Sequence, residues 1–271
     1  MLKIVKDFVL RTSRFFGFEV LRPGDIEQRD FAIHLGRLFA EFEIDCVFDV
    51  GANTGQYRDF LRDRIGYHGP IVSFEPVARN VDILRQRSLR DRHWVIEGYA
   101  LGAAPGSASL KVAAESQFSS FRESDYSKVP RVDGFNVVDH DESVIIRTLD
   151  DVFPPLRARL GFQRPYLKLD TQGYDMEVLR GAGRTLPMFS ALQTELSVIA
   201  IYKNVPDYLE SIKFLTEHHF DVSGLFPIKR DLKLRVIEFD CVTVNRAVAQ
   251  LGQEQRLKAP PTSRTTVDAH L

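Results

Sequence analysis

The residues best placed to do chemistry lie at the ends of short apolar runs. Cys46–Val50 is a run of strand type that contains one acid, Asp49, and it is followed by Gly51 and Gly55. Glycines at a strand-to-helix turn let a ligand approach the backbone, where the free amide groups of the helix start face outward. In an α/β sheet, the crevice at the carboxyl ends of the strands usually binds a nucleotide-like cofactor. We therefore expect such a cofactor at this turn.

The spacing of the glycines separates two classes of cofactor. A dinucleotide fingerprint reads G-x-G-x-x-G and places a pyrophosphate on the amino end of the helix, but the third glycine position does not fit here. Asp49 stands just before Gly51. A carboxylate in that place suits a cofactor with a cationic amino-acid end, such as S-adenosylmethionine, better than one with a pyrophosphate. The pattern D-x-G-A-x-x-G resembles the first motif of the Rossmann-like methyltransferases.

A second apolar run ends in an acid about twenty residues further on. Ile71–Phe74 is followed directly by Glu75 and Pro76. A carboxylate at the tip of the second strand can accept both ribose hydroxyl groups of an adenosine. A tight loop without a ligand explains one glycine turn equally well, but it does not explain an acid at this interval.

Two further segments make the pattern specific. Trp94–Gly102 has the pattern of a strand followed by a turn of small residues, and Tyr166–Ala182 that of a strand, a turn at Gly173 and a short helix that stops at Gly181. The motifs DVGANTG, FEP, ALG, RTLDDVF, LKLDTQGYDMEVLRGA and TELS follow one another in this order. Together they resemble the FkbM-type methyltransferase family, over roughly residues 44 to 245.

The resemblance implies a Rossmann-like α/β fold with a seven-stranded, mostly parallel sheet, one antiparallel strand and helices on both faces. It implies methyl transfer from S-adenosylmethionine to a hydroxyl group of a sugar, a glycolipid or a secondary metabolite, so the partner is a small-molecule or glycan acceptor. Two alternatives stay open, a nicotinamide-dependent oxidoreductase and a non-catalytic partner protein that keeps the fold. The residues expected to bind the cofactor are Asp49, Gly51, Ala52, Asn53, Gly55, Tyr57, Glu75, Pro76, Ala100, Leu101 and Asp170.

Methyl transfer from a sulfonium is an in-line displacement, so the protein must hold the acceptor behind the methyl group, and a base must take the proton of an alcohol. Asp170, at the tip of the fourth strand, is a candidate to bind the amino end of the cofactor or to orient the acceptor; the alternative is a turn acid that caps its own following amides. Lys168 needs a partner, because a buried strand seldom carries an unpaired lysine, and we expect Glu195 to pair with it. Whether that pair is structural or catalytic stays open. Glu195 is also a candidate to bind the acceptor.

His140 is a further candidate base, with a solvated loop histidine as the alternative. No metal is expected, because Asp175 and Glu177 are two residues apart and cannot easily face one ion from a helix.

Composition favours one large α/β domain in a reducing compartment. The chain has 271 residues, is 44% hydrophobic and carries a formal charge of −1, which argues against nucleic-acid binding. Cys46 and Cys241 both lie in apolar runs and are expected in the core. No apolar stretch approaches the roughly twenty residues that span a bilayer, and no secretory signal is evident. We therefore expect a cytoplasmic protein.

The chain divides into an amino-terminal helical extension (1–42), a methyltransferase domain (43–247) and a disordered tail (248–271). Up to Arg22 the extension holds five basic residues against two acids. Such a helix can make weak contact with an anionic membrane surface, or else pack on the core or over the crevice; residues 28 to 42 are expected to form a second helix. Within the domain, residues 113 to 146 are expected to form an irregular insertion over the substrate pocket, and Pro227–Asp231 to reverse the chain between the last two strands. The oligomeric state stays open.

Overall fold

The computed structural model describes residues 28–125, 129 and 137–250. The basic segment up to Arg22 and residues 251–271 of the expected tail lie outside the described residues. The helices are α3 (Arg29–Glu41), α4 (Gln56–Phe60), α5 (Ala78–Ser88), α6 (Leu149–Leu160), α7 (Asp175–Arg180) and α8 (Tyr208–Glu217), with a π-helical turn η1 (Leu61–Ile65) and the 3-10 turns η2 (Ser116–Phe118) and η3 (Leu186–Met188). The strands are β1 (Cys46–Val50), β2 (Ile71–Phe74), β3 (Trp94–Glu97), β4 (Ala100–Leu101), β5 (Gly106–Ala113), β6 (Val138–Arg147), β7 (Pro165–Leu169), β8 (Ala191–Ser197), β9 (Phe220–Arg230) and β10 (Val236–Asn245).

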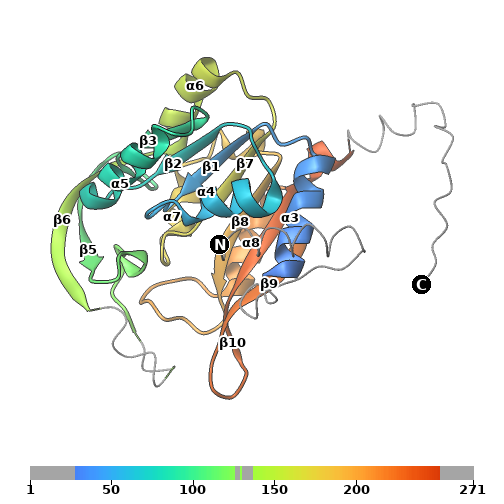
Figure 1. Cartoon of the computed structure of the whole chain (residues 1–271). Coiled ribbons are helices and arrows are strands. Elements are labelled where there is room, and N and C mark those ends of the chain that lie inside the picture. Colours follow the sequence, from blue (N-terminus) through green and yellow to red (C-terminus); the bar gives the residue numbers. More distant parts are fainter. Residues whose placement is uncertain (1–27, 126–128, 130–136, 251–271) are drawn as a thin grey trace, which may run out of the picture.

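A seven-stranded sheet in the order β3-β2-β1-β7-β8-β10-β9 forms the centre of the molecule (Figure 1). Neighbouring strands are parallel from β3 to β8, whereas β10 is antiparallel to both β8 and β9. The expected seven-stranded, mostly parallel sheet with one antiparallel strand is therefore confirmed. Because β9 again runs in the direction of β8, the β9–β10 hairpin lies at the same edge of the sheet as the carboxyl ends of the parallel strands.

Helices cover both faces of this sheet, as expected. One core cluster joins the sheet to α6, α7 and α8, and a second joins it to α3, the α4–η1 helix and α5. β1 and β7 are buried along their whole length, as strands between two helical layers must be. Phe48 is the centre of the first cluster, where its ring lies within 5.3–5.8 Å of the rings of Phe74, Phe153, Phe162 and Phe189.

The helix expected at residues 28 to 42 is confirmed as α3. Its buried residues are Phe31, Leu35, Leu38 and Phe39, which recur at helical spacing. Phe31 stacks on Phe60 at 5.5 Å between ring centres. This helix therefore closes the sheet face on which α4 begins.

The insertion at residues 113 to 146 is less irregular than expected. β6 pairs with β5 as an antiparallel hairpin, and with β4 they form a second, three-stranded sheet in the order β4-β6-β5. The strand is difficult to predict from the sequence, because Asp139 to Glu142 are four consecutive polar residues and break the alternation of apolar and polar residues that is typical of a strand. Only Val144 and Ile146, near the other end of β6, face an apolar cluster.

The reversal between the last two strands lies later than expected. β9 continues through Pro227 to Arg230, and the chain turns at residues 231 to 235 instead of at Pro227–Asp231. Asp231 closes the turn, since its Oδ1 accepts hydrogen bonds from the backbone amides of Lys233 and Arg235. β9 is the edge strand of the sheet, where a proline is tolerated because the outward amide has no ladder partner to lose.

Two other segments differ from the sequence-based expectation. α6 was not expected, because Pro154 and Pro155 lie inside it and proline removes a helical hydrogen bond. Thr148 begins this helix by accepting a hydrogen bond from the amide of Asp151 at 3.2 Å. Residues 248–250, assigned to a disordered tail, are helical. None of the helices in the described residues has the length and apolar character needed to cross a membrane.

The aromatic cluster gives a first prediction. Phe48→Ala is expected to lower the free energy of unfolding by about 3–5 kcal/mol, because the surrounding rings cannot fill the cavity left behind. Urea unfolding followed by circular dichroism measures this change. Leu89→Ala, at a leucine that is 85% exposed, is the matched control and is expected to change stability by less than about 0.5 kcal/mol. Equal losses in the two variants would show that Phe48 is not the centre of the core.

Candidate active site

A cavity of about 480 Å³ lies at the carboxyl ends of the parallel strands. Its wall is formed by the start of α3, the turn after β1 with α4, the end of β2, β4, the β5–β6 insertion, the end of β7 with the turn after it, and the strands β8, β9 and β10. The charged residues of the wall, among the described residues, are Glu75, Lys168, Asp170, Glu195 and Asp240. Four carboxyl groups and one ammonium group make this an acidic cavity.

The β1–α4 turn brings the backbone of two strand tips into contact. Gly51 has φ +80°, and a Cβ atom there would lie 1.9 Å from the carbonyl oxygen of Asp170. Only glycine fits this position. Gly51, Ala52 and Asn53 line the cavity as predicted. Gly55 does not, because it packs against the Trp94 ring, where a Cβ would lie 2.6 Å from the nearest carbon.

Glu75 ties this turn to the end of β2. Its Oε2 accepts a hydrogen bond from the amide of Asn53 at 2.7 Å, and its Oε1 accepts from the amide of Val77 at 3.0 Å and from Nδ2 of Asn80 at 3.3 Å. Burial raises the pKa of Glu75 to about 7, although these hydrogen bonds oppose the shift. The carboxyl group is thus held rigidly in the wall, and its remaining lone pairs can accept from hydroxyl groups in the cavity.

The wall beyond Glu75 is apolar. Its side chains are those of Phe74, Pro76, Tyr99, Ala100, Leu101 and Leu110. Pro76, Ala100 and Leu101 were predicted to lie here, whereas Tyr99 was not. The Tyr99 ring lies 5.9 Å from that of Phe74, edge to face. Its position directly before Ala100 was the signal that sequence reasoning missed.

Lys168 pairs with Asp49. The sequence analysis had expected Glu195 as its partner, and that expectation is wrong. Its Nζ donates to Asp49 Oδ1 at 3.0 Å and to the carbonyl oxygen of Gly51 at 3.2 Å, and it lies 3.5 Å from Asp170 Oδ2. Burial opposes the charge, but the carboxylates of Asp49 and Asp170 hold the pKa of Lys168 above its usual range. Asp49 is fully buried and does not line the cavity. The structure therefore places Asp49 beneath the cavity, where it binds Lys168 instead of a cofactor.

The ion pair belongs to a line of polar side chains that crosses the sheet. The register pairs Asp49 with Ser73 on β2 and with Lys168 on β7, and Lys168 with Gln193 on β8. Ser73 Oγ donates to Asp49 Oδ2 at 3.0 Å, and Trp94 Nε1 donates to Ser73 Oγ at 2.9 Å. We call Ser73, Asp49, Lys168 and Gln193 the polar row.

Gln193 extends the polar row toward the last strand. The hydroxyl group of Tyr57 donates to Gln193 Oε1 at 2.9 Å, and Gln193 Nε2 donates to Asp240 Oδ1 at 2.7 Å. Tyr57 lines the cavity as predicted, and its ring centre lies 5.2 Å from Lys168 Nζ. Gln193 and Asp240 were missed, because each lies in a strand with several polar residues and does not stand out in the sequence.

Two carboxyl groups face each other at this end of the cavity. Glu195 and Asp240 lie directly opposite on the antiparallel strands β8 and β10. Burial raises the pKa of Asp240 to about 7, and burial together with the charge of Asp170 raises the pKa of Glu195 well above its usual value. Like charges in such a position disfavour double ionisation, so the pair retains a proton near neutral pH.

Asp170 lies between this pair and Lys168. It lines the cavity as predicted, and its Oδ1 accepts a hydrogen bond from Gln172 Nε2 at 2.9 Å. The same Gln172 nitrogen lies 3.5 Å from Glu195 Oε2. Asp170 and Glu195 are therefore brought together, as the sequence predicted. No group of three metal-ligating side chains occurs within the described ranges.

His140 is not brought to the cavity. It lies near the end of the β5–β6 ladder, opposite Val112, with its side chain exposed. Its Nδ1 lies 3.0 Å from Asp139 Oδ2, and its Nε2 lies 3.7 Å from Glu142 Oε2. The candidate base of the sequence analysis is thus a surface residue of β6.

The insertion contributes Ser116, Gln117, Ser119 and Phe121 to the wall. Ser116 Oγ donates to Asn53 Oδ1 at 2.7 Å, which joins the insertion to the β1–α4 turn. On the other side, Ser120 Oγ donates to the carbonyl oxygen of Gln172 at 2.7 Å. The described part of the insertion therefore bridges the two halves of the cavity.

Comparison with known proteins adds an independent line of evidence. Residues 49–222 match the sequence profile of the Methyltransferase FkbM domain, and no curated protein sequence matches the chain. A crystal structure of Methyltransferase FkbM from Methylobacillus flagellatus KT is 14% identical with a TM-score of 0.48; the alignment covers 74% of this chain and 43% of that one. Aeropyrum pernix fibrillarin with natively bound S-adenosyl-L-methionine is 14% identical with a TM-score of 0.41, over 74% and 66% of the two chains. An rRNA methylase from Streptococcus thermophilus is 13% identical with a TM-score of 0.39, over 79% and 96%.

The buried ion pair gives a second prediction. Lys168→Met is expected to lower the free energy of unfolding by about 3–5 kcal/mol, because it leaves the Asp49 carboxylate buried without its cation. Adding Asp49→Asn removes that isolated charge and should restore much of the loss, so the two changes should not be additive. Urea unfolding of both single variants and the double variant at neutral pH measures the coupling. Additive losses would mean that the two side chains contribute independently.

Proposed function

The chain belongs to the FkbM methyltransferase family, and from this premise we propose that it transfers a methyl group from S-adenosylmethionine to a hydroxyl group of a sugar, a glycolipid or a secondary metabolite. The observation that supports this cofactor is the set of carboxyl groups in the cavity. Four carboxyl groups line it, and its one lysine is already paired with Asp49 and Asp170. Such a wall offers hydrogen-bond acceptors to a ligand that carries hydroxyl and ammonium groups. The acceptor class rests on the family alone.

The residues of the wall fit the parts of this cofactor. Glu75 would accept hydrogen bonds from the ribose hydroxyl groups, and Tyr99 and Leu101 would enclose the adenine on its apolar side. Asp170 would face the amino end, beside the backbone of Gly51. When bound, S-adenosylmethionine supplies a methyl group on a cationic sulfur atom, which is open to in-line attack.

A nicotinamide dinucleotide fits less well. Its pyrophosphate needs free amide groups or cations at the start of the helix. Here the amide of Asn53 donates to Glu75, and the amide of Thr54 donates to Gln56 Oε1 at 3.2 Å. A pyrophosphate at this turn would meet the Glu75 carboxyl group instead of a cation.

The carboxyl pair at the other end of the cavity suits the acceptor. A base works best when its pKa lies near the working pH, and the pKa of Asp240 is raised to about 7 by burial. Asp240 and Glu195 lie directly opposite each other on β10 and β8, so both carboxyl groups would be placed to take the proton of an acceptor hydroxyl. Gln193 and Tyr57 hold Asp240 in place through their hydrogen bonds.

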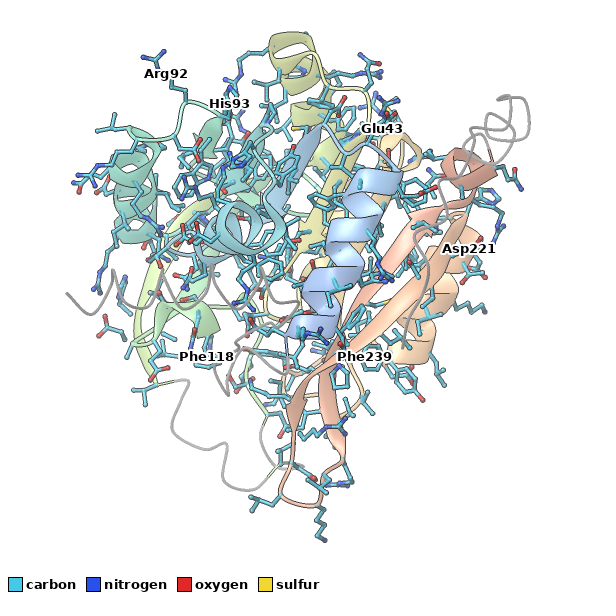
Figure 2. All side chains as sticks on the ribbon, turned by 45° about the vertical axis from the view of Figure 1, so that its right-hand side comes forward. Glu43, Arg92, His93, Phe118, Asp221 and Phe239 are labelled. Carbon is cyan, nitrogen blue, oxygen red and sulfur yellow. The ribbon has the colours of Figure 1, made fainter. Side chains whose placement is uncertain are left out.

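Calorimetric titration tests the cofactor. We expect the purified chain to bind S-adenosylmethionine and S-adenosylhomocysteine but not NAD. Glu75→Ala is expected to weaken binding roughly ten- to a hundredfold, because a charge-assisted hydrogen bond contributes about 1.5–3 kcal/mol. The matched control is Glu43→Ala, an exposed acid at the opposite edge of the sheet, which should leave binding unchanged (Figure 2). Binding of NAD alone would contradict the proposal, and binding of none of the three would favour a non-catalytic protein with this fold.

The titration of Glu75 gives a further prediction. Its carboxyl group accepts ribose hydroxyl groups best when ionised, and burial raises its pKa to about 7. Affinity for S-adenosylhomocysteine should therefore rise roughly tenfold between pH about 6 and pH about 8. Glu75→Gln should flatten this rise, whereas any titration of the ligand itself is common to both proteins. An equal rise in the variant would mean that another group controls binding.

A further inference from the structure

The tip of the β9–β10 hairpin presents two leucines to solvent. Leu232 and Leu234 are each 75% exposed, and among the exposed large apolar residues of the described chain only Leu89 is more so. A closed turn holds them there, because the amide of Leu234 donates to the carbonyl oxygen of Asp231 at 3.0 Å and the amide of Asp231 donates to that of Arg235 at 2.9 Å. Leu234 has φ +64°, a left-handed conformation that a leucine rarely adopts. The turn therefore has a strained backbone at Leu234 and an exposed apolar tip formed by Leu232 and Leu234.

Basic residues surround this tip. Lys229, Arg230, Lys233 and Arg235 lie within the last residues of β9 and the turn. Lys229 lies 4.0 Å from Glu238, and Arg235 lies 2.7 Å from Asp231. Arg230 donates to the carbonyl oxygen of Leu234, and neither Arg230 nor Lys233 has a carboxylate partner among the described residues. The tip therefore carries a net positive charge beside its leucines.

The hairpin stands next to the mouth of the cavity. Phe226, Pro227 and Ile228, just before the tip in β9, line the cavity. Lys229 Nζ lies 5.3 Å from the ring centre of Phe118 in the insertion. Figure 1 shows the hairpin projecting beyond the other described elements at the bottom of the view, and Figure 2 shows Phe118 toward the same side, with Arg92 and His93 at the opposite edge.

We propose that the hairpin tip binds an anionic lipid bilayer. Leu232 and Leu234 enter the boundary between head groups and acyl chains, and Arg230 and Lys233 face the anionic head groups. The charge favours anionic lipids over an uncharged apolar partner, because Arg230 and Lys233 have no carboxylate partner in the part of the chain that the structure describes. This inference concerns the surface beside the cavity and needs no bound cofactor, so its test is separate from that of the proposed function.

Vesicle sedimentation tests the proposal with the full chain. We expect it to bind vesicles of phosphatidylcholine with phosphatidylglycerol and not vesicles of phosphatidylcholine alone. Leu232→Ser combined with Leu234→Ser should weaken binding at least roughly tenfold, because two leucines no longer leave water. Arg230→Glu combined with Lys233→Glu should weaken it and reduce its dependence on salt. Leu89→Ser is the matched control, an exposed leucine three residues before Arg92 at the opposite edge, and should bind as the unchanged chain does.

Several results would overturn the proposal. Equal binding to both kinds of vesicle would show that anionic lipid is not the partner, and binding to neither would show that the tip does not serve a bilayer. Binding that the leucine and charge variants leave unchanged would place the contact outside the hairpin tip. An equal loss in the Leu89 variant would show a general effect of exposed leucines. Circular dichroism and urea unfolding check that each variant is folded.

Discussion

The structure depends on one buried ion pair, between Lys168 and Asp49. Two charges taken out of water are stable only if each finds its partner, and here the pair is completed by Ser73, by the carbonyl oxygen of Gly51 and by Asp170. The pair fixes the register of β1 against β7, because a slip of one strand by one residue would turn one of the two side chains to the other face of the sheet. That register in turn brings the Gly51 backbone against the carbonyl oxygen of Asp170. The position of the buried Lys168 ammonium group therefore determines how the backbone at the base of the cavity is arranged.

Local patterns in the sequence predict the fold and one side of the cavity. Short apolar runs that end in Gly51, Glu75 or Ala100 carry their own signal, since strand, turn and side chain lie within a few residues of one another. The ion pair could not be predicted in the same way. Lys168 is 119 positions from Asp49, and only the register of the folded sheet decides between Asp49 and Glu195 as its partner. The prediction for His140 was wrong because this residue belongs to β6, a strand that its polar residues conceal in the sequence, and this strand places it away from the cavity.

The carboxyl groups at the two ends of the cavity have different surroundings. Glu75 is surrounded by amide donors, which hold a carboxyl group in one orientation without supplying a full charge. Glu195 and Asp240 instead face each other, and burial raises the pKa of both. The first arrangement suits the recognition of a fixed ligand, whereas the second suits the gain and loss of a proton. Gln193 pairs with Lys168 in the sheet register and donates to Asp240, and the charge of Lys168 only partly offsets the effect of burial on the pKa of Asp240.

The two ends of the cavity are also formed by different parts of the sequence. Most of the parts that fit a cofactor come from the segment of β1, β2 and β4, before residue 102, with Asp170 as the exception, whereas Gln193, Glu195 and Asp240 come from β8 and β10, after residue 190. A ribosome therefore releases the first set long before the second exists. Mutations that accumulate in the last strands can alter the acceptor end while they leave the earlier turns untouched. Because β10 lies between β8 and β9, a substitution in the last strands can reach the Glu195–Asp240 end of the cavity without changing the turns that follow β1 and β2.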